Sequence, residues 1–181
     1  MANKIIHKLF PSPVFQFKIE NYEEINKQLI EYIYGLKKED DQGIKRSNVN
    51  GWHSKNFKIE KDNVPYNFIK SIHGHIKEVI VDGFGWKYIP DKVGITEIWS
   101  IINKKGTFNT SHNHPGSYLS AAYYVKAPNE CGNIHFFDPN EIKKFNSPPI
   151  ENPTDLSTSG FSIKPEEGNL FLFPSYLYHD V

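Results

Sequence analysis

Three histidines in this sequence have a spacing that could hold a metal ion. His112 and His114 lie two residues apart, and side chains at positions i and i+2 of an extended segment point to the same side. His179 follows the apolar run 170–178, which is typical of a buried strand that ends in a turn. Neutral imidazole binds zinc, copper, nickel and non-haem iron. The alternative is that the pair are solvated loop side chains and that His179 is only packed in the core.

The composition bounds the protein class and its partners. The chain has 181 residues, enough for one domain with a sizeable core, and 21 Lys and Arg residues balance 21 Asp and Glu residues. A chain without net charge has no field that attracts nucleic acid or an anionic membrane. The single Cys131 excludes an intramolecular disulfide, and no apolar run has the roughly 20 residues of a membrane span. We expect a cytoplasmic protein that binds neither nucleic acid nor membrane, with its oligomeric state open.

The first ninety residues are predicted to hold two helices and an edge strand. Alternating aromatics follow two prolines in 9–17, which favours an edge strand. Asn21 begins a capping pattern, and apolar residues at helical spacing then predict a helix of about 14 residues. Pro65 suits the first position of a second helix, whose apolar stripe runs over 68–80. We assign 1–90 to this helical and edge-strand part of a single domain.

Three further residues in this part are not assigned to the metal site. His73 and His75 lie two residues apart on the predicted second helix, where their side chains diverge by about 200 degrees and cannot chelate one ion. We predict both to be surface histidines. Trp52 either covers the site or fills the core, and the core is favoured because large aromatics mostly serve burial.

From residue 91 onward the pattern indicates strands. β-Branched and aromatic runs between turn signals predict five strands, at 95–102, 118–125, 133–137, 161–163 and 169–173. The segment 140–160 carries three prolines and a Ser/Thr cluster, and a connection of this length is more often a functional lid or a disordered segment than a plain linker. Helices followed by closely spaced strands predict a mostly β (α+β) domain, with a barrel-like core over 91–181.

These motifs resemble the 2-oxoglutarate and Fe(II)-dependent oxygenases, and most closely a branch with an HxH…H motif. The similarity lies in Trp99, Gly106, His112-x-His114-Pro115-Gly116-Ser117, Ser120-x-x-Tyr123-Tyr124-Val125, Gly132-Asn133-Ile134 and residues 168–175 with His179. The segments 9–14 and 47–54 also look like that branch, so the resemblance covers nearly the whole chain. It implies a cupin-like double-stranded β-helix, or jelly roll, with flanking N-terminal helices.

The resemblance also implies the site and its chemistry. His112 and His179 match the two iron-binding histidines of the superfamily, and His114 stands at the position of its aspartate. Tyr124 and Ser120 fall where the superfamily places polar groups near the co-substrate. The implied cofactors are Fe(II), 2-oxoglutarate and O2. The implied reaction is hydroxylation of a small-molecule or peptidyl substrate, coupled to decarboxylation of 2-oxoglutarate to succinate and CO2.

The ligand set departs from the superfamily pattern at His114. The usual triad has two histidines and one carboxylate, and it leaves open positions for co-substrate and oxygen. Three histidines with an open position also suit zinc, which activates water. Asp138 is the alternative source of a carboxylate, although the pair Asp138-Pro139 is also a turn signal that ends a strand.

The second departure concerns the cation that pairs with the distal carboxylate of 2-oxoglutarate. The superfamily usually places this Arg or Lys roughly ten residues after the distal histidine, beyond Val181. Lys126 or Lys164 is the alternative within the sequence. By the same comparison, the jelly roll is expected to lack its last strand at this end.

Two other functions stay open at this point. One is a metal enzyme that does not use 2-oxoglutarate, either a zinc hydrolase or a cupin-like dioxygenase. The other is a catalytically inactive β-barrel that only binds a ligand. The metal that co-purifies and the binding of a keto acid would distinguish them.

Overall fold

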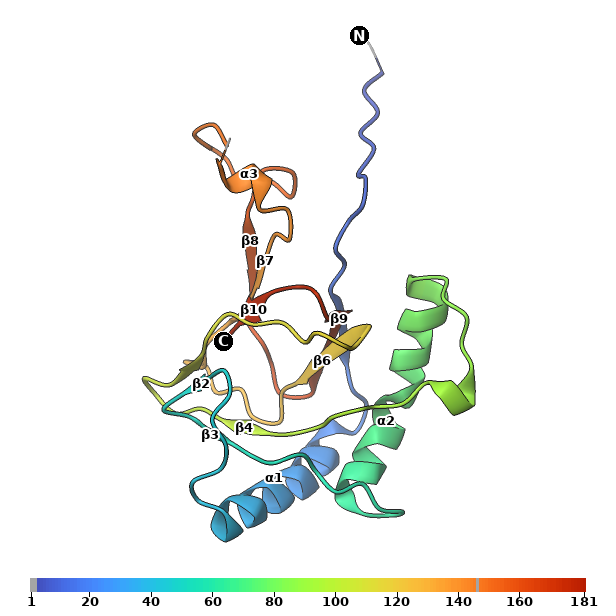
Figure 1. The fold of residues 1–181 in the computed structure, drawn as a ribbon, viewed down its shortest axis with the longest axis vertical. Coiled ribbons are helices and arrows are strands. Elements are labelled where there is room, and N and C mark those ends of the chain that lie inside the picture. The colour runs from blue at the N-terminus through green and yellow to red at the C-terminus, as the bar shows by residue number, and fades with distance from the viewer. Residues whose placement is uncertain (1–2, 146) are drawn as a thin grey trace.

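Two long helices pack on one side of a mostly β structure (Figure 1). The computed structural model describes residues 3–145 and 147–181. Helix α1 spans Tyr22–Glu39 and helix α2 spans Val64–Glu78, followed by a π-helical turn over Val79–Gly83. No helix that the structure describes is long and apolar enough to cross a membrane.

The helix ends differ from the sequence prediction in detail. Asn21 precedes α1 with a left-handed φ of 52° and makes no side-chain capping bond, so the predicted cap does not form. The helix has 18 residues, rather than the roughly 14 predicted. Acidic residues in the first turn and lysines in the last turn stabilise α1 through the helix dipole instead. In α2 the cap is Asn63, whose side chain accepts a hydrogen bond from the amide of Tyr66, and Pro65 lies in the first turn.

The larger sheet is antiparallel and has the strand order β1-β9-β6. Strand β1 spans Phe15–Lys18, β9 spans Asn169–Pro174 and β6 spans Leu119–Tyr123. Strand β1 pairs only with β9, so the predicted edge strand is confirmed, although it is shorter than 9–17. Strand β9 lies in the centre and is the sheet's only fully buried strand in the described chain.

A second sheet carries the distal histidine. Its order is β10-β7-β8, with β7 at Ile134–Phe137, β8 at Gly160–Ile163 and β10 at His179–Asp180. Register places His179 opposite Phe136. The last residues of the sequence thus form part of this sheet.

Two short ladders connect the N-terminal part to the β core. Strand β2 (Asn48–Val49) pairs with β5 (Phe108–Asn109), and β3 (Trp52–His53) pairs with β4 (Ile101–Ile102). The predicted strand over 95–102 is therefore reduced to its last two residues, because only these lie opposite β3.

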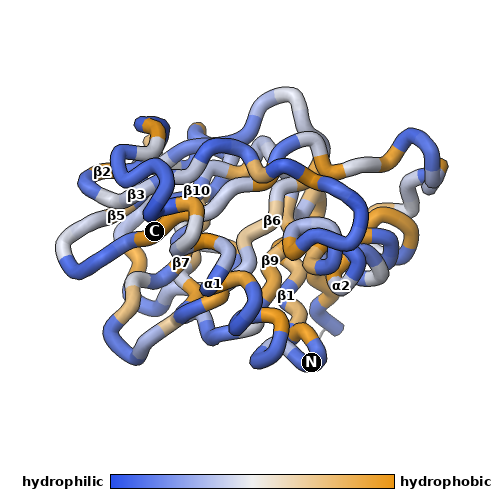
Figure 2. The backbone as a smooth tube through the Cα atoms, turned by 90° about the horizontal axis from the view of Figure 1, so that it is seen from below, coloured by the Kyte–Doolittle hydropathy of each residue, from blue (hydrophilic) through white to orange (hydrophobic). Residues whose placement is uncertain are grey.

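The core consists of two apolar clusters on opposite faces of β9. Leu170 and Leu172 face the helices, whereas Phe171 and Phe173 join Phe136 in the second cluster. Burial of both faces explains why β9 reads as a continuous apolar run rather than an alternating one. Figure 2 shows the apolar segments of β1 and β9 beside the helices. Trp52 is only 5% exposed in the first cluster, which confirms its core assignment.

Two segments project together from this body (Figure 1). One is the N-terminal tail, residues 3–14. The other is the arm, residues 138–159 between β7 and β8, which contains the short helix α3 (Ile142–Phe145); residue 146 lies outside the described residues. Lys8 of the tail forms an ion pair with Asp155 of the arm, so the two segments lie side by side.

Candidate metal centre

The structure brings His112, His114 and His179 together from separate segments. His112 and His179 form an antiparallel bridge in which each amide donates to the other's carbonyl, at 3.0 and 2.9 Å. The amide of His114 donates to the carbonyl of Ser175 at 3.0 Å, so the loop of 111–117 is fixed to the turn after β9. One ring nitrogen from each histidine lies within 4.8 Å of the others. No other group of three His, Cys, Asp or Glu side chains with this spacing occurs in the described residues.

Backbone carbonyls orient two of the three imidazoles. Nδ1 of His112 donates to the carbonyl of Thr110 at 2.7 Å, and Nδ1 of His179 donates to that of Leu177 at 3.0 Å. A carbonyl can only accept, so the proton must lie on Nδ1 and the lone pair on Nε2. A hydrogen bond at the non-coordinating nitrogen is the usual support of a metal-binding histidine. Both rings are therefore arranged to bind a cation through Nε2.

Burial favours the uncharged form of His114 and His179. Burial lowers the pKa of His179 to about 4, and burial also lowers the pKa of His114. His179 is 5% exposed and packs its ring against Phe173 at 4.8 Å and Phe136 at 6.2 Å between centroids. Deprotonated imidazole is the form that binds metal.

Two aromatic side chains beside the triad, His53 and Trp99, were not predicted to belong to the site. His53 is buried, and its ring stacks on Trp99 with centroids 5.6 Å apart and planes at 15°. Trp99 in turn contacts His114, with centroids 5.5 Å apart. Nδ1 of His53 donates to the carbonyl of Ser54 at 2.6 Å. A sequence signal existed, because His53 follows the core residue Trp52 on an extended segment and must face the opposite side.

Tyr124 and Ser120 lie on the same side of the sheet as the second cluster. Side chains alternate along β6, and Ala122 and Tyr124 both pack on this cluster, so Ser120 shares their face. The hydroxyl of Tyr124 is fully buried and has no hydrogen-bond partner within the described part of the chain. Burial raises the pKa of Tyr124, so the hydroxyl keeps its proton and is a donor. Buried donors are normally hydrogen-bonded, so this hydroxyl is available to an acceptor on a bound ligand or a water molecule.

Asp138 does not join the three histidines. Its carboxylate accepts hydrogen bonds from the amide of Asn140 at 2.8 Å and from the ammonium of Lys143 at 2.7 Å. These contacts belong to a turn after β7, as the pair Asp138-Pro139 indicates. The alternative of Asp138 as a metal ligand is therefore not supported by its placement. Lys126 and Lys164, the alternative cations, are both exposed.

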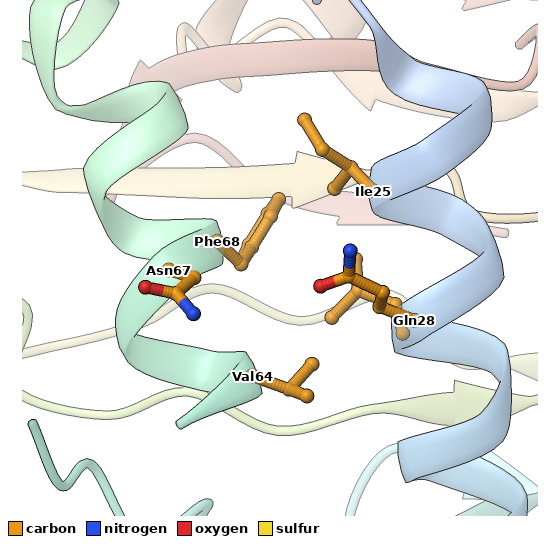
Figure 3. A pocket seen from close by; sticks show the side chains of 6 residues that line it. Ile25, Gln28, Val64, Asn67 and Phe68 are labelled. Atoms are coloured by element: carbon orange, nitrogen blue, oxygen red, sulfur yellow. The ribbon is translucent and has the colours of Figure 1, made fainter. Parts of the chain in front are cut away.

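A separate pocket lies between α1 and α2 (Figure 3). Its lining is Ile25, Gln28, Leu29, Val64, Asn67 and Phe68. None of these residues is ionisable, and none belongs to the histidine cluster. This pocket is a gap in helix packing rather than part of the metal centre.

Comparisons with known proteins bear on the family and on the fold. Residues 97–181 match the model of a family described as "Putative 2OG-Fe(II) oxygenase", which confirms the resemblance drawn from the motifs. The fold is similar to that of a Pseudomonas putida prolyl-4-hydroxylase, with a TM-score of 0.64 and 12% identity over 94% of this chain and 84% of that chain. At this identity the likeness shows the fold alone. A comparison with curated proteins gives no match.

Proposed function

We propose that this chain, whose residues 97–181 belong to the 2OG-Fe(II) oxygenase family, is a hydroxylase with iron held by His112, His114 and His179. The observation that carries the proposal is the convergence of three imidazole nitrogens within 4.8 Å, two of them oriented through Nδ1 by backbone carbonyls. Fe(II) accepts imidazole ligands, and a one-sided set leaves coordination positions open.

The proposed scaffold is a double-stranded β-helix. Sheets β1-β9-β6 and β10-β7-β8 contribute Phe171, Phe173 and Phe136 to a shared apolar interior. The similarity to the prolyl-4-hydroxylase fold supports the same architecture. In this scaffold the histidines lie at one end of the interior, where His179 contacts Phe173.

The site residues fit the groups that this family implies. Fe(II), 2-oxoglutarate and O2 together supply the oxidising chemistry, in which decarboxylation to succinate and CO2 is coupled to hydroxylation of a C–H bond. The hydroxyl of Tyr124 would donate its unused hydrogen bond to a carboxylate oxygen of 2-oxoglutarate. The phenylalanines of the interior would exclude water from the reacting groups.

The histidine at position 114 has an electrostatic consequence. Three neutral imidazoles would leave the two positive charges of Fe(II) to be balanced by the two carboxylates of 2-oxoglutarate. Iron, histidines and 2-oxoglutarate would then be neutral as a whole. A carboxylate ligand at position 114 would add one negative charge. Burying a neutral complex of iron, histidines and 2-oxoglutarate beside Phe136 and Phe173 costs less free energy than burying a charged complex.

We place the substrate beside His53 and Trp99. Trp99 lies between His53 and His114 and offers a flat apolar surface next to the metal position. His53 donates through Nδ1, so its Nε2 is an acceptor for a substrate hydroxyl or N–H group. The related fold is that of a prolyl-4-hydroxylase, and a prolyl side chain in a peptide is a suitable first candidate among small-molecule and peptidyl substrates.

The test is formation of succinate. Full-length protein, purified without oxygen and loaded with Fe(II), is mixed with 2-oxoglutarate and O2, with and without a proline-containing peptide. We expect slow succinate formation without peptide and faster formation with a true substrate. Zinc-loaded protein and His112→Ala serve as controls and should form none. Succinate at the control level in protein with verified iron would overturn the proposal, and hydrolytic activity of the zinc form would favour the hydrolase instead.

A further inference from the structure

Large apolar side chains are concentrated on the tail and the arm. The tail and arm, together with the adjoining strand β8, carry nine large apolar residues that are at least 44% exposed: Ile5, Ile6, Leu9, Phe10, Ile142, Phe145, Ile150, Leu156 and Phe161. Lys8 and Asp155 form an ion pair, so the tail and the arm, which project in the same direction (Figure 1), meet at that point. Monomeric proteins rarely expose a contiguous apolar surface of this extent.

Val14 at the end of the tail packs on the second cluster, and the residues before it are held by surface contacts. Phe10 is 95% exposed and has a left-handed φ of 58°, a conformation that bulky residues rarely adopt without support from neighbours. The contacts of the tail with the rest of the chain include the Lys8–Asp155 ion pair and a hydrogen bond between the hydroxyls of Ser12 and Tyr176 at 3.3 Å. Both contacts are at the surface, where such pairs contribute little to stability.

The neighbouring sheet has an open edge. Strand β8 pairs with β7 alone in the described chain, so its outer side offers backbone groups to another strand. Phe161 lies on β8 and is 64% exposed, which makes the open edge continuous with the apolar surface of the arm. An extended tail is a suitable partner for such an edge.

We propose that the tail and arm form a two-fold interface with a second copy of this chain, in which the tail of each copy packs on the arm and β8 of the other. Each copy carries both halves of this contact, the extended segment and the surface that receives it, as a symmetric dimer requires. Nine side chains that each expose on the order of 100 Å² present roughly 900 Å², compared with about 800 Å² per partner in a stable interface. With 21 positive and 21 negative residues, two copies do not repel each other.

Light scattering coupled to size exclusion tests this proposal on the full chain. We expect the wild type to have twice the mass of the 20.9 kDa chain. Phe10→Asp combined with Phe161→Asp should shift the protein to a monomer. The matched control is Tyr34→Asp, which places the same charge at a 49% exposed aromatic of α1 and should remain a dimer. A monomeric wild type, or a dimer that survives the double substitution, would overturn the proposal.

A crosslinking measurement locates the contact without relying on disruptive charges. In a Cys131→Ser background, Phe10→Cys and Phe161→Cys are made as separate proteins and mixed under oxidising conditions. We expect a disulfide-linked species that contains one of each chain. The amount of this mixed disulfide is compared with the amount of disulfide-linked dimer that each protein forms alone. If the mixed disulfide is not more abundant, the tail does not pack on the partner's β8, and the proposed geometry is wrong.

Discussion

Backbone carbonyls, rather than carboxylates, hold the rings of His112 and His179. These bonds fix the tautomer while adding no charge near the metal position. With histidine at position 114, the three ligands and their two backbone supports carry no negative charge, and the carboxylate that acts on His114 is that of Glu97. A carboxylate-containing co-substrate is then the natural source of negative charge for a bound cation. We therefore propose that the site binds metal and keto acid together.

Tyr124→Phe tests the assignment of the unpaired hydroxyl. Removing a buried donor that has no protein partner should leave the free energy of unfolding unchanged or raise it by about 1 kcal/mol. The same change should weaken 2-oxoglutarate binding by roughly tenfold, since one charge-assisted hydrogen bond is lost. Chemical denaturation and titration of 2-oxoglutarate into the iron form measure the two effects. Loss of stability with unchanged 2-oxoglutarate affinity would show that the hydroxyl serves the fold.

The metal-free protein should lose stability as the pH falls. The pKa of His179 is lowered from 6.5 to about 4 in the folded state, and that of His114 is lowered as well. The unfolded chain then binds more protons between these values, so the stabilisation is present above about pH 6.5 and is lost as the pH falls toward 4. For His179 we expect a loss on the order of 2 to 3 kcal/mol.

Denaturation in a metal chelator at a series of pH values checks this loss. His179→Gln, which cannot be protonated, should flatten the pH dependence relative to the wild type. A wild-type stability that stays constant from about pH 7 to pH 4.5 would contradict the account.

The three histidines could be found from local sequence patterns, whereas the contact of His53 with Trp99 could not. The spacing of His112 and His114, and the apolar run before His179, are local patterns. The contact of His53 with Trp99 joins segments 46 positions apart, because 99 minus 53 is 46, and it depends on the pairing of β3 with β4. The unpaired hydroxyl of Tyr124 is a property of the packed core and has no sequence signal.

Among the elements, β9 connects the metal centre to the rest of the fold. It separates the two apolar clusters, pairs with β1 and β6, and leads to the turn that fixes His114 through the carbonyl of Ser175. Its sequence was predictable, since six buried residues in a row are typical of a central strand. The short ladders of β3 with β4 and of β2 with β5 were not, because two-residue strands carry no periodicity.

Truncation of a side chain on β9 should therefore be costly. Phe171 is fully buried, and we expect Phe171→Ala to lower the free energy of unfolding by about 3 to 5 kcal/mol. Tyr34→Ala removes an exposed aromatic from α1 and should change it by less than about 1 kcal/mol. Urea denaturation compares the two variants. Similar losses would mean that β9 is not the structural centre.

At the scale of the whole molecule, the tail and arm distinguish this chain from a plain barrel. The sequence predicted a long segment over 140–160, but it did not predict that the apolar side chains of this segment would be exposed.

An apolar interface between two copies without net charge has little electrostatic energy for salt to screen. We expect dimer dissociation, measured by sedimentation at increasing dilution, to change by less than about threefold between roughly 0.05 and 0.5 M salt. A much steeper dependence would indicate that ion pairs between the two copies dominate the contact.

The binding of 2-oxoglutarate to the iron form is the most direct test of a three-histidine metal site. Full-length protein without oxygen is loaded with Fe(II), and the weak visible charge-transfer band of the iron and 2-oxoglutarate complex is recorded. We expect this band in the wild type and in His73→Ala, which changes an exposed histidine of α2. We expect loss of the band in His112→Ala, His114→Ala and His179→Ala, each checked for folding by circular dichroism. No band in iron-loaded wild type, or a band that persists in all three variants, would contradict a three-histidine oxygenase site.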